Sequence, residues 1–306
     1  MIKFNKNHVP GIVLWSIVTI LAIYIATLLF APADYLEVAF IDVGQGDAAF
    51  IRPPSGTVVL LDAGGDWRRN RNVGRDVVGQ FLIRRGVRSV DKAIVSHFHE
   101  DHGLGFVELA EIMRIHSFFM PDTEHRPRLH YELVETAERM NAPIYYLSRG
   151  HILHIDENTH FEILFPLAAG TSYHSGITFF REHPPHINDD SLVMRLHFGN
   201  TTFLFTGDIE ERAELVLLRE PRLNSDVLKV AHHGSRTSTM QEFLDAVNPR
   251  YAVISAGLNN QFNHPHPEVM ARLTARPNLT TFRTDLHGTI TFLVDQNGIF
   301  TIRTSR

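Results

Sequence analysis

The stretch Ser96-His97-Phe98-His99-Glu100-Asp101-His102-Gly103 decides the fold. It follows an apolar β-type run at residues 92–95 and precedes a segment, 105–115, whose pattern predicts a helix. His97 and His99 are two residues apart, so in an extended loop both imidazoles leave on the same side and can bind one divalent ion. Asp101 and His102 are adjacent and can turn toward a second ion. Nitrogen and oxygen ligands of this kind suit zinc, with manganese as an alternative.

Chance is the other explanation of this stretch, because the chain contains 19 His. A His-x-His-x-Asp-His pattern between a β-type run and a helix seldom arises by chance, so we interpret it as half of a two-metal hydrolytic site. The four residues match the signature of the metallo-β-lactamase superfamily. Four further segments resemble the hydrolase domains of ComEC-type DNA-internalisation competence proteins: Ile41-Asp42-Val43-Gly44-Gln45-Gly46-Asp47, Asn188-Asp189-Asp190-Ser191, Thr206-Gly207-Asp208-Ile209-Glu210 and His232-His233-Gly234-Ser235.

This resemblance extends over residues 35–302 and implies the four-layer αβ/βα sandwich, with the metals at one edge between two sheets. The resemblance does not include the many-helix membrane channel of those proteins. We therefore expect this chain to be the hydrolase module alone, on a different anchor. The residue pattern agrees with an α/β fold, because short β-branched runs alternate with amphipathic helical ones after residue 35. We expect the last two strands, 289–294 and 299–302, to close the second sheet.

Composition restricts the function classes. The 306 residues are 44% apolar and 21% charged, which is typical of a globular protein. Acids outnumber Lys plus Arg by 34 to 29, so no global positive field would hold a nucleic acid, and any such binding must be local. The chain has no cysteine, which excludes disulfides and thiolate ligands. A metal site must therefore use His and Asp.

An uncharged apolar run at residues 11–30 is about as long as a membrane-spanning helix requires. A cleaved signal peptide is the alternative, but its apolar region is usually only about 7 to 15 residues long. Lys3 and Lys6 precede the run, whereas Asp34 and Glu37 follow it. The positive-inside rule then predicts a cytoplasmic N-terminus at 1–10, a single-pass anchor at 11–30 and a domain at 31–306 outside the cytoplasmic membrane.

The second half of the predicted site comes from later strand ends. Asp208 can bridge both ions through its two carboxylate oxygens, and Gly207 lets the backbone pass close to them. Of the adjacent His232 and His233, we assign His232 as the ligand of the second ion and His233 as a catalytic group that faces the substrate, because neighbouring side chains at a strand end diverge. The reverse assignment remains open.

Several other residues are predicted around this centre. Asn188 occupies a position where many superfamily members have His, so it binds an ion weakly or orients substrate, and His186 is the alternative. Asp62 is expected to orient a metal ligand. Ser235 is predicted to contact substrate. His264, in Asn263-His264-Pro265-His266-Pro267, either reaches the substrate as a catalytic group or only accompanies the prolines that begin a helix.

Two further segments are candidates for contact with the substrate or for covering the site. Trp67-Arg68-Arg69-Asn70-Arg71 places basic residues beside an aromatic one, which suits a phosphate-rich strand, although a solvated loop is the more common reason for such charges. Residues 168–185 are rich in Gly, Ser, Pro and aromatics and are predicted to form a loop over the site.

The resulting hypothesis is a membrane-anchored hydrolase with two divalent metal ions that acts on phosphodiesters, with single-stranded DNA as a candidate substrate and a competence or envelope membrane protein as a candidate partner. Two other functions remain open at this stage. One is hydrolysis of small esters, lactones or β-lactams, because a fold does not fix a substrate. The other is a binding module without catalysis.

Overall fold

The computed structural model describes residues 15–21, 35–169 and 186–306. The chain divides into two compact units, Met1–Asp34 and Tyr35–Arg306. In the first unit, residues 15–21 form a short helix. Within the described ranges, no helix is both long enough and apolar enough to cross a bilayer. The remainder of the predicted anchor at 11–30, and residues 170–185 of the predicted loop, lie outside the described residues.

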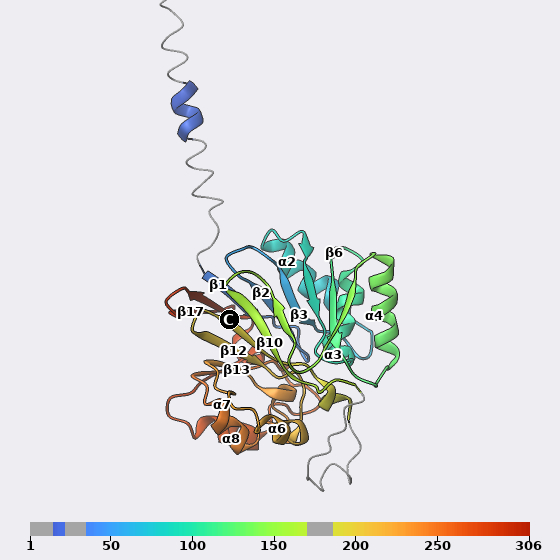
Figure 1. Cartoon of the computed structure of the whole chain (residues 1–306), viewed down its shortest axis with the longest axis vertical. Helices are drawn as coiled ribbons and strands as arrows, with labels where there is room; N and C mark the ends of the chain where they lie inside the picture. The colour runs from blue at the N-terminus through green and yellow to red at the C-terminus, as the bar shows by residue number, and fades with distance from the viewer. Residues whose placement is uncertain (1–14, 22–34, 170–185) are drawn as a thin grey trace, which may run out of the picture. The chain divides into compact units, whose positions relative to one another are not determined.

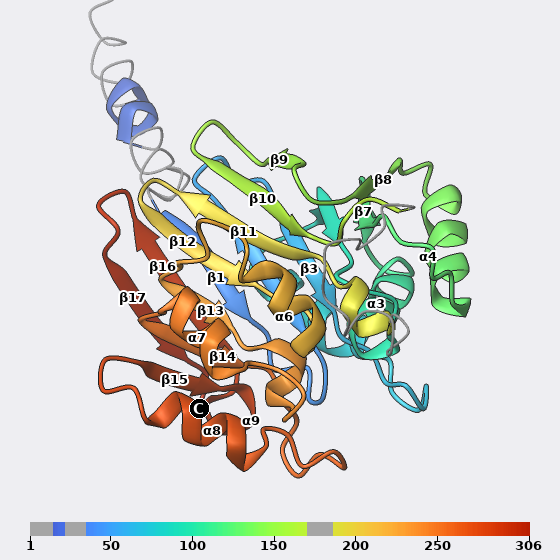
Figure 2. The same cartoon turned by 60° about the horizontal axis from the view of Figure 1, so that its bottom comes forward.

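The second unit is built on two large sheets that lie face to face (Figures 1 and 2). The eight-stranded sheet contains, in spatial order, β17 (Phe300–Thr304), β16 (Ile290–Asp295), β1 (Tyr35–Phe40), β2 (Ala48–Arg52), β3 (Val59–Ala63), β5 (Lys92–Ile94), β7 (Phe118–Pro121) and β8 (Ile144–Leu147). The seven-stranded sheet contains β15 (Thr280–Arg283), β14 (Tyr251–Ile254), β13 (Val227–Lys229), β12 (Thr201–Phe205), β11 (Val193–Phe198), β10 (Thr159–Phe165) and β9 (Ile152–His154).

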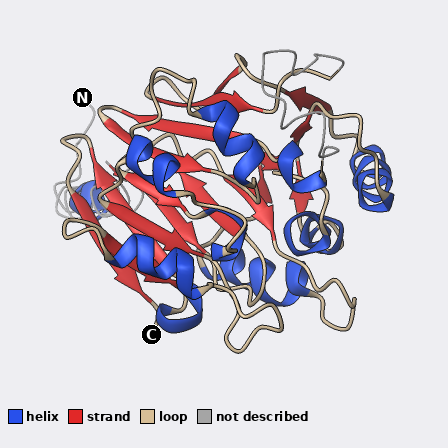
Figure 3. Cartoon of the chain, turned by 90° about the horizontal axis from the view of Figure 1, so that it is seen from below, coloured by secondary structure: helices blue, strands red, loops and turns tan. Residues whose placement is uncertain are grey.

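Helices cover both outer faces of the paired sheets, as Figure 3 shows. The first sheet packs against η1 (Gly74–Gly79), α2 (Gln80–Arg84), α3 (Glu100–Leu109) and α4 (Arg128–Arg139). The second sheet packs against α6 (Glu211–Leu217), α7 (Gln241–Val247) and α8 (Pro267–Thr274). The remaining short elements are β4 (Ser89–Val90), β6 (Arg114–Ile115), η2 (Ile187–Asp190), η3 (Ala231–Gly234) and α9 (Thr284–His287). The unit is therefore a mixed α/β sandwich of four layers.

The central core lies between the two sheets. Phe40 of β1 stacks on Phe205 of β12 from the other sheet, with ring centroids 5.8 Å apart, and meets Phe292 of β16 edge-on at 6.0 Å. All three rings are almost fully buried. Burial of one such side chain contributes roughly 1.5–3 kcal/mol, so the contact between the sheets is a major source of stability.

Parallel strands bring the loops of the site to one edge. β3 pairs in parallel with β5, and β12 pairs in parallel with β13. The carboxyl ends of β5 and β12 meet across the sandwich, because the amide of Leu192 bonds to the carbonyl of Ser96 (2.8 Å) and Gly207 packs against Ser96. Ligand sites of open α/β sheets lie beyond such strand ends. We call this side of the sandwich the metal edge.

The predicted α/β sandwich is confirmed. The prediction for the last two strands was wrong. β16 pairs with β1 along its whole length, from Asp295 opposite Tyr35 to Ile290 opposite Phe40, and β17 pairs with β16. Both strands belong to the first sheet. The alternating pattern does not show which sheet a strand joins, because a strand in either sheet would bury the same apolar face.

Candidate metal centre

The His-rich stretch spans a loop and the first turn of a helix. α3 begins at Glu100, earlier than the predicted position 105, so Asp101 and His102 are helical residues while His97 and His99 precede the helix. Asp62, which ends β3, fixes this turn. Its carboxylate accepts hydrogen bonds from the Ser96 amide (2.7 Å) and hydroxyl (2.7 Å), and contacts Nδ1 of His102 at 2.9 Å. This contact is the one expected of an orienting carboxylate, and it leaves Nε2 of His102 facing the site.

Asp208 lies at the centre of the cluster and is 2% exposed. Its Oδ2 atom is 3.2 Å from Nε2 of His102 and 3.3 Å from Nε2 of His233. The Nε2 atoms of His97 and His232 are each 3.9 Å from the same oxygen. Four imidazoles from two segments of the chain, the His-rich stretch and η3, therefore surround one carboxylate. Gly207 makes this possible, because its φ of +51° is left-handed and a Cβ there would lie 2.8 Å from the Cβ of Ser191.

His232 and His233 differ sharply in their surroundings. The Nδ1–H of His233 donates to the carbonyl oxygen of Ser255 (2.9 Å), so Nε2 faces Asp101, whose Oδ2 is 3.3 Å away, and Asp208. His233 is 1% exposed. His232 is only partly buried, and its Nδ1 contacts Glu210 at 3.2 Å. Both residues have left-handed backbones, with φ of 47° and 54°, and this turn sends their rings in different directions.

Asn188 reaches the same region through η2. It is 3% exposed, its Nδ2 donates to Oε1 of Glu210 (3.1 Å), and its Oδ1 is buried without a hydrogen-bond partner among the described residues. Glu210 therefore holds both Asn188 and His232. His186 caps the same turn through its own Nδ1, and its ring centroid lies 6.3 Å from that of His99. Sequence reasoning did not single out Glu210, which lies two residues after Asp208.

The predicted substrate-facing residues lie beside the cluster. The ring of His264 is 5.4 Å from that of His232 and 6.0 Å from that of His233, centroid to centroid. Asn260 fixes the backbone of His264 by hydrogen bonds to both its amide and its carbonyl. Ser235 instead makes a local contact, with its hydroxyl 2.9 Å from that of Thr237. The structure thus brings His264 to the site and shows Ser235 engaged within its own turn.

Asp47 and Lys229 belong to the cluster and were missed as site residues. Asp47 offers a carboxylate oxygen to a group of four potential metal ligands, with His102, Asp208 and His233, whose ligand atoms all lie within 4.8 Å of one another. Lys229 forms an ion pair with Asp47, and the two side chains are 4% and 8% exposed. The signal for Asp47 was present in the sequence: a Gly-x-Gly turn that ends in an acid. Lys229 had none, because strand lysines are usually exposed.

The backbone of the Gly44–Asp47 turn packs directly on the His-rich stretch. A Cβ on Gly46 would collide with the carbonyl oxygen of Asp101. The amide of Asp47 donates to that same oxygen at 3.1 Å. The turn and the first helical turn of α3 therefore fix each other, which places the Asp47 carboxylate within the cluster.

Electrostatics favour a cation in this cluster. Burial alone would lower the pKa of His102, but the negative charges of Asp208 and Asp62 raise it well above its usual value. The pKa of His233 is raised in the same way by Asp208 and Asp101, against the effect of burial. Burial would raise the pKa of Asp208, but the imidazoles around it lower its pKa well below the usual range. Carboxylates that stabilise positively charged imidazoles this strongly would also stabilise a metal ion.

The atoms suited to bind a metal are the ones left unsatisfied. Oδ1 of Asp208 and the Nε2 atoms of His102 and His233 are buried and lack well-formed hydrogen bonds within the described ranges. Buried polar atoms normally have such partners, so this concentration of unpaired atoms is suited to binding a metal ion. Imidazole nitrogens and carboxylate oxygens without thiolates suit zinc or manganese. The residues present therefore fit the predicted divalent ions.

A sequence profile of the Metallo-beta-lactamase superfamily matches residues 41–257, which include all of the clustered residues except His264. The chain belongs to the metallo-β-lactamase superfamily. Among solved structures, the metallo-β-lactamase fold protein YhfI from Bacillus subtilis matches with a TM-score of 0.53. The alignment has 12% identity and covers 80% of this chain and 95% of that one, so it shows the fold alone.

Curated relatives within this superfamily confirm the resemblance to ComEC-type competence proteins. ComE operon protein 3 of Bacillus subtilis (strain 168) is 32% identical over 269 residues, which cover 84% of this chain and 33% of that protein. Competence protein ComA of Neisseria gonorrhoeae is 27% identical over 275 residues, covering 88% of this chain and 34% of that protein. The chain thus spans about a third of the length of these two relatives.

The Trp67 segment reaches the neighbourhood of His264. Trp67 is 52% exposed, and the guanidinium of Arg68 lies 4.7 Å from its ring centroid. Arg68 also donates to Oε1 of Gln261 (3.0 Å), which lies three residues before His264. Arg69 is paired with Glu132 instead (2.9 Å). This segment therefore presents Trp67 and Arg68 beside the metal edge, while Arg69 has a structural partner.

Proposed function

We propose that this chain is a metal-dependent phosphodiesterase that cleaves single-stranded DNA outside the cytoplasmic membrane, in connection with DNA uptake. The observation that carries the proposal is the convergence of His102 and His233 on the Asp208 carboxylate, with Asp101 3.3 Å from Nε2 of His233. Two supporting observations favour a phosphodiester substrate. The aromatic and basic pair Trp67 and Arg68 lies beside the site, and two relatives are competence-related proteins by name.

The proposed ligand sets follow from the directions of the side chains. His97, His99 and Asp208, with Oδ1 of Asn188, would hold the first ion. Asp101, His102, His233 and the shared Asp208 would hold the second. In this assignment His233 replaces His232 as the ligand, because Nε2 of His233 faces two carboxylates whereas Nδ1 of His232 faces Glu210. His232 takes the role at the substrate side.

The chain's own residues prepare the reaction in three ways. When bound, a pair of divalent ions supplies Lewis acidity, which activates a water and polarises the ester. Asp101 and Asp208 would hold the ions, and their carboxylate oxygens could accept hydrogen bonds from a nearby water. Burial lowers the pKa of His264 to about 3, so this residue is neutral at neutral pH. His264 therefore orients an oxygen of the substrate by a hydrogen bond and does not serve as the proton donor.

Membrane attachment is part of the proposal. The uncharged run at 11–30, with Lys3 and Lys6 before it, supports a single-pass anchor that leaves the domain at 31–306 on the outer side. Protease added to intact spheroplasts should therefore digest the domain. Protection that ends only when the membrane is opened would reverse this orientation, and a mature N-terminus near Ala33 would establish a cleaved signal peptide.

A substrate panel tests the activity. The full-length chain, purified in a neutral detergent and loaded with zinc or manganese, should cleave a single-stranded oligonucleotide and bis(p-nitrophenyl) phosphate. Asp208→Asn should abolish both reactions, whereas Asp245→Asn, at an exposed acid on α7, should leave both unchanged. Hydrolysis of a lactone or a β-lactam without cleavage of either phosphodiester would replace this function with the small-ester alternative. Metal binding without any hydrolysis would support the binding-module alternative.

A further inference from the structure

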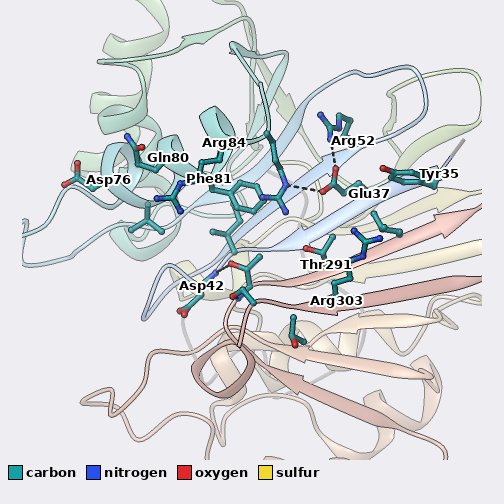
Figure 4. Close-up of a pocket in the computed structure, with 17 residues that line it drawn as sticks. Tyr35, Glu37, Asp42, Arg52, Asp76, Gln80, Phe81, Arg84, Thr291 and Arg303 are labelled. Atoms are coloured by element: carbon teal, nitrogen blue, oxygen red, sulfur yellow. Dashed lines mark hydrogen bonds and ion pairs between the residues drawn. The ribbon is translucent and has the colours of Figure 1, made fainter. Parts of the chain in front are cut away.

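A second polar pocket, which the proposed chemistry does not use, lies on the outer face of the eight-stranded sheet (Figure 4). Its volume is about 610 Å³, and it is enclosed by η1 and α2 on one side and by β1, β2, β16 and β17 on the other. Four arginines line it: Arg52, Arg84, Arg85 and Arg303. We call it the arginine pocket.

The floor of the arginine pocket is a fixed ion-pair network. Glu37 of β1 is buried, and each of its carboxylate oxygens meets an arginine: Arg52 at 2.8 Å and Arg85 at 3.2 Å. The guanidinium of Arg85 also lies over the ring of Phe81, 3.8 Å from its centroid. These contacts hold both arginines in place before any ligand arrives, and the two guanidinium charges together exceed the single negative charge of Glu37.

The remaining charges of the pocket are unbalanced. Its other two acids already have partners outside the lining, since Asp42 pairs with Arg306 at 2.7 Å and Asp76 with Arg75 at 2.8 Å. Arg84 and Arg303 are exposed, and their side chains have no hydrogen bond or ion pair in the part of the chain that the structure describes. The pocket thus combines two arginines held by Glu37 with two arginines that have no side-chain partner among the described residues. Such a group of guanidinium charges suits a phosphate group.

The arginine pocket is separate from the metal edge. Glu37 alternates along β1 with Leu36 and Val38, which point into the core between the sheets, so the pocket lies on the opposite face of the first sheet. None of the proposed metal ligands lines it. A phosphate bound here would therefore not be the one that is cleaved.

We propose that the arginine pocket binds the phosphodiester headgroup of an anionic phospholipid. This inference rests on the membrane attachment in the proposed function. Tyr35, which lines the pocket and is 37% exposed, follows the apolar run at 11–30 by only a few residues in the sequence. Tyrosine is typical of the membrane interface, and arginines beside an anionic membrane gain contacts with lipid phosphates. The pocket would hold the domain against the lipid surface.

Calorimetric titration of the full-length chain in a neutral detergent tests this. Short-chain phosphatidylglycerol should bind at least five-fold more tightly than short-chain phosphatidylcholine. The double variant Arg84→Ser/Arg303→Ser should weaken phosphatidylglycerol binding roughly ten-fold, because two unpaired cations are removed. The matched control Arg88→Ser/Arg114→Ser makes the same change in net charge at two exposed arginines outside the pocket and should bind as the wild type does.

Other outcomes would overturn the inference. Equal affinity for the two lipids, or an equal loss of phosphatidylglycerol affinity in the two double variants, would show that the pocket does not recognise the headgroup. Inorganic phosphate that binds as tightly as phosphatidylglycerol would make this a site for free phosphate, and preferential binding of an oligonucleotide that the Arg84/Arg303 variant loses would make it a nucleic-acid site. Hydrolysis of bis(p-nitrophenyl) phosphate by the same preparations separates these failures from a failure of the proposed function.

Discussion

Lys229 and Asp47 form a buried ion pair behind the metal centre. The Asp47 carboxylate lies 3.5 Å from Nδ1 of His233 and 3.9 Å from Nδ1 of His102, on the side of each ring opposite Asp208. Burial would raise the pKa of Asp47, but the Lys229 charge and the hydrogen bond from His233 lower it to about 2. Asp47 is therefore charged at neutral pH, and Lys229 is the cation that balances it.

Removal of Lys229 alone should leave that buried carboxylate without its nearest counter-charge. We expect Lys229→Met to lower the free energy of unfolding of the metal-free chain by about 3–5 kcal/mol in urea titrations. The double variant Lys229→Met/Asp47→Asn should lose clearly less, because it has no unpaired charge. Lys92→Met makes the same substitution at a partly exposed position and should cost under about 1 kcal/mol. Equal losses in the single and double variants would mean that Lys229 acts by packing.

Metal content should separate the two adjacent histidines. Elemental analysis of the wild type, after loading with zinc, should find about two ions per chain. His233→Ala should lose one of them, since its Nε2 faces both Asp101 and Asp208, whereas His232→Ala should retain both and lose activity. The reverse result would restore His232 as the ligand. Asp208→Ala should release at least one ion, and Asn188→Ala should cost much less metal because an amide oxygen is a weaker ligand than a carboxylate.

Arginines near Trp67 should distinguish DNA from a small ester. We expect Arg68→Ser/Arg71→Ser to raise the KM for single-stranded DNA several-fold and to reduce the salt dependence of binding, because each phosphate contact contributes a slope of about 0.7 for single strands. Hydrolysis of bis(p-nitrophenyl) phosphate should hardly change. Arg69 stays unmutated because it pairs with Glu132. Parallel losses on both substrates would assign this segment a structural role.

His130, which is not one of the proposed metal ligands, should make stability depend on pH. Burial, followed by the charge of Arg126, lowers the pKa of His130 from 6.5 to about 4. The unfolded chain therefore binds more protons between these values, so the contribution of His130 is complete above pH 6.5 and is lost as the pH falls toward 4. Between pH 6.5 and 4, the free energy of unfolding of the metal-free chain, from urea titrations, should fall by about 2 kcal/mol less in His130→Gln than in the wild type. Identical pH profiles would contradict this.

Part of this site was readable from the sequence because its residues are close together in the chain. His97, His99, Asp101 and His102 fall within six positions, and their spacing alone indicates two ions. Asp62 and Asp208 end strands, and strand ends collect at one edge of an α/β fold. The alternation of short β-branched runs with amphipathic helical ones likewise predicted the α/β class, since burial of one face of each element requires such patterns. The four-layer sandwich followed from the family resemblance.

The tertiary structure decided what depends on partners distant in the sequence. His232 and His233 are neighbours of the same type, and only the carbonyl of Ser255 and the carboxylate of Glu210 distinguish them. The pairing of β16 with β1 and the ion pair of Lys229 with Asp47 join residues separated by most of the domain, so no local pattern records them. Side-chain chemistry and periodicity are properties of the sequence, whereas the partner that satisfies a buried charge is chosen only when the sheets close.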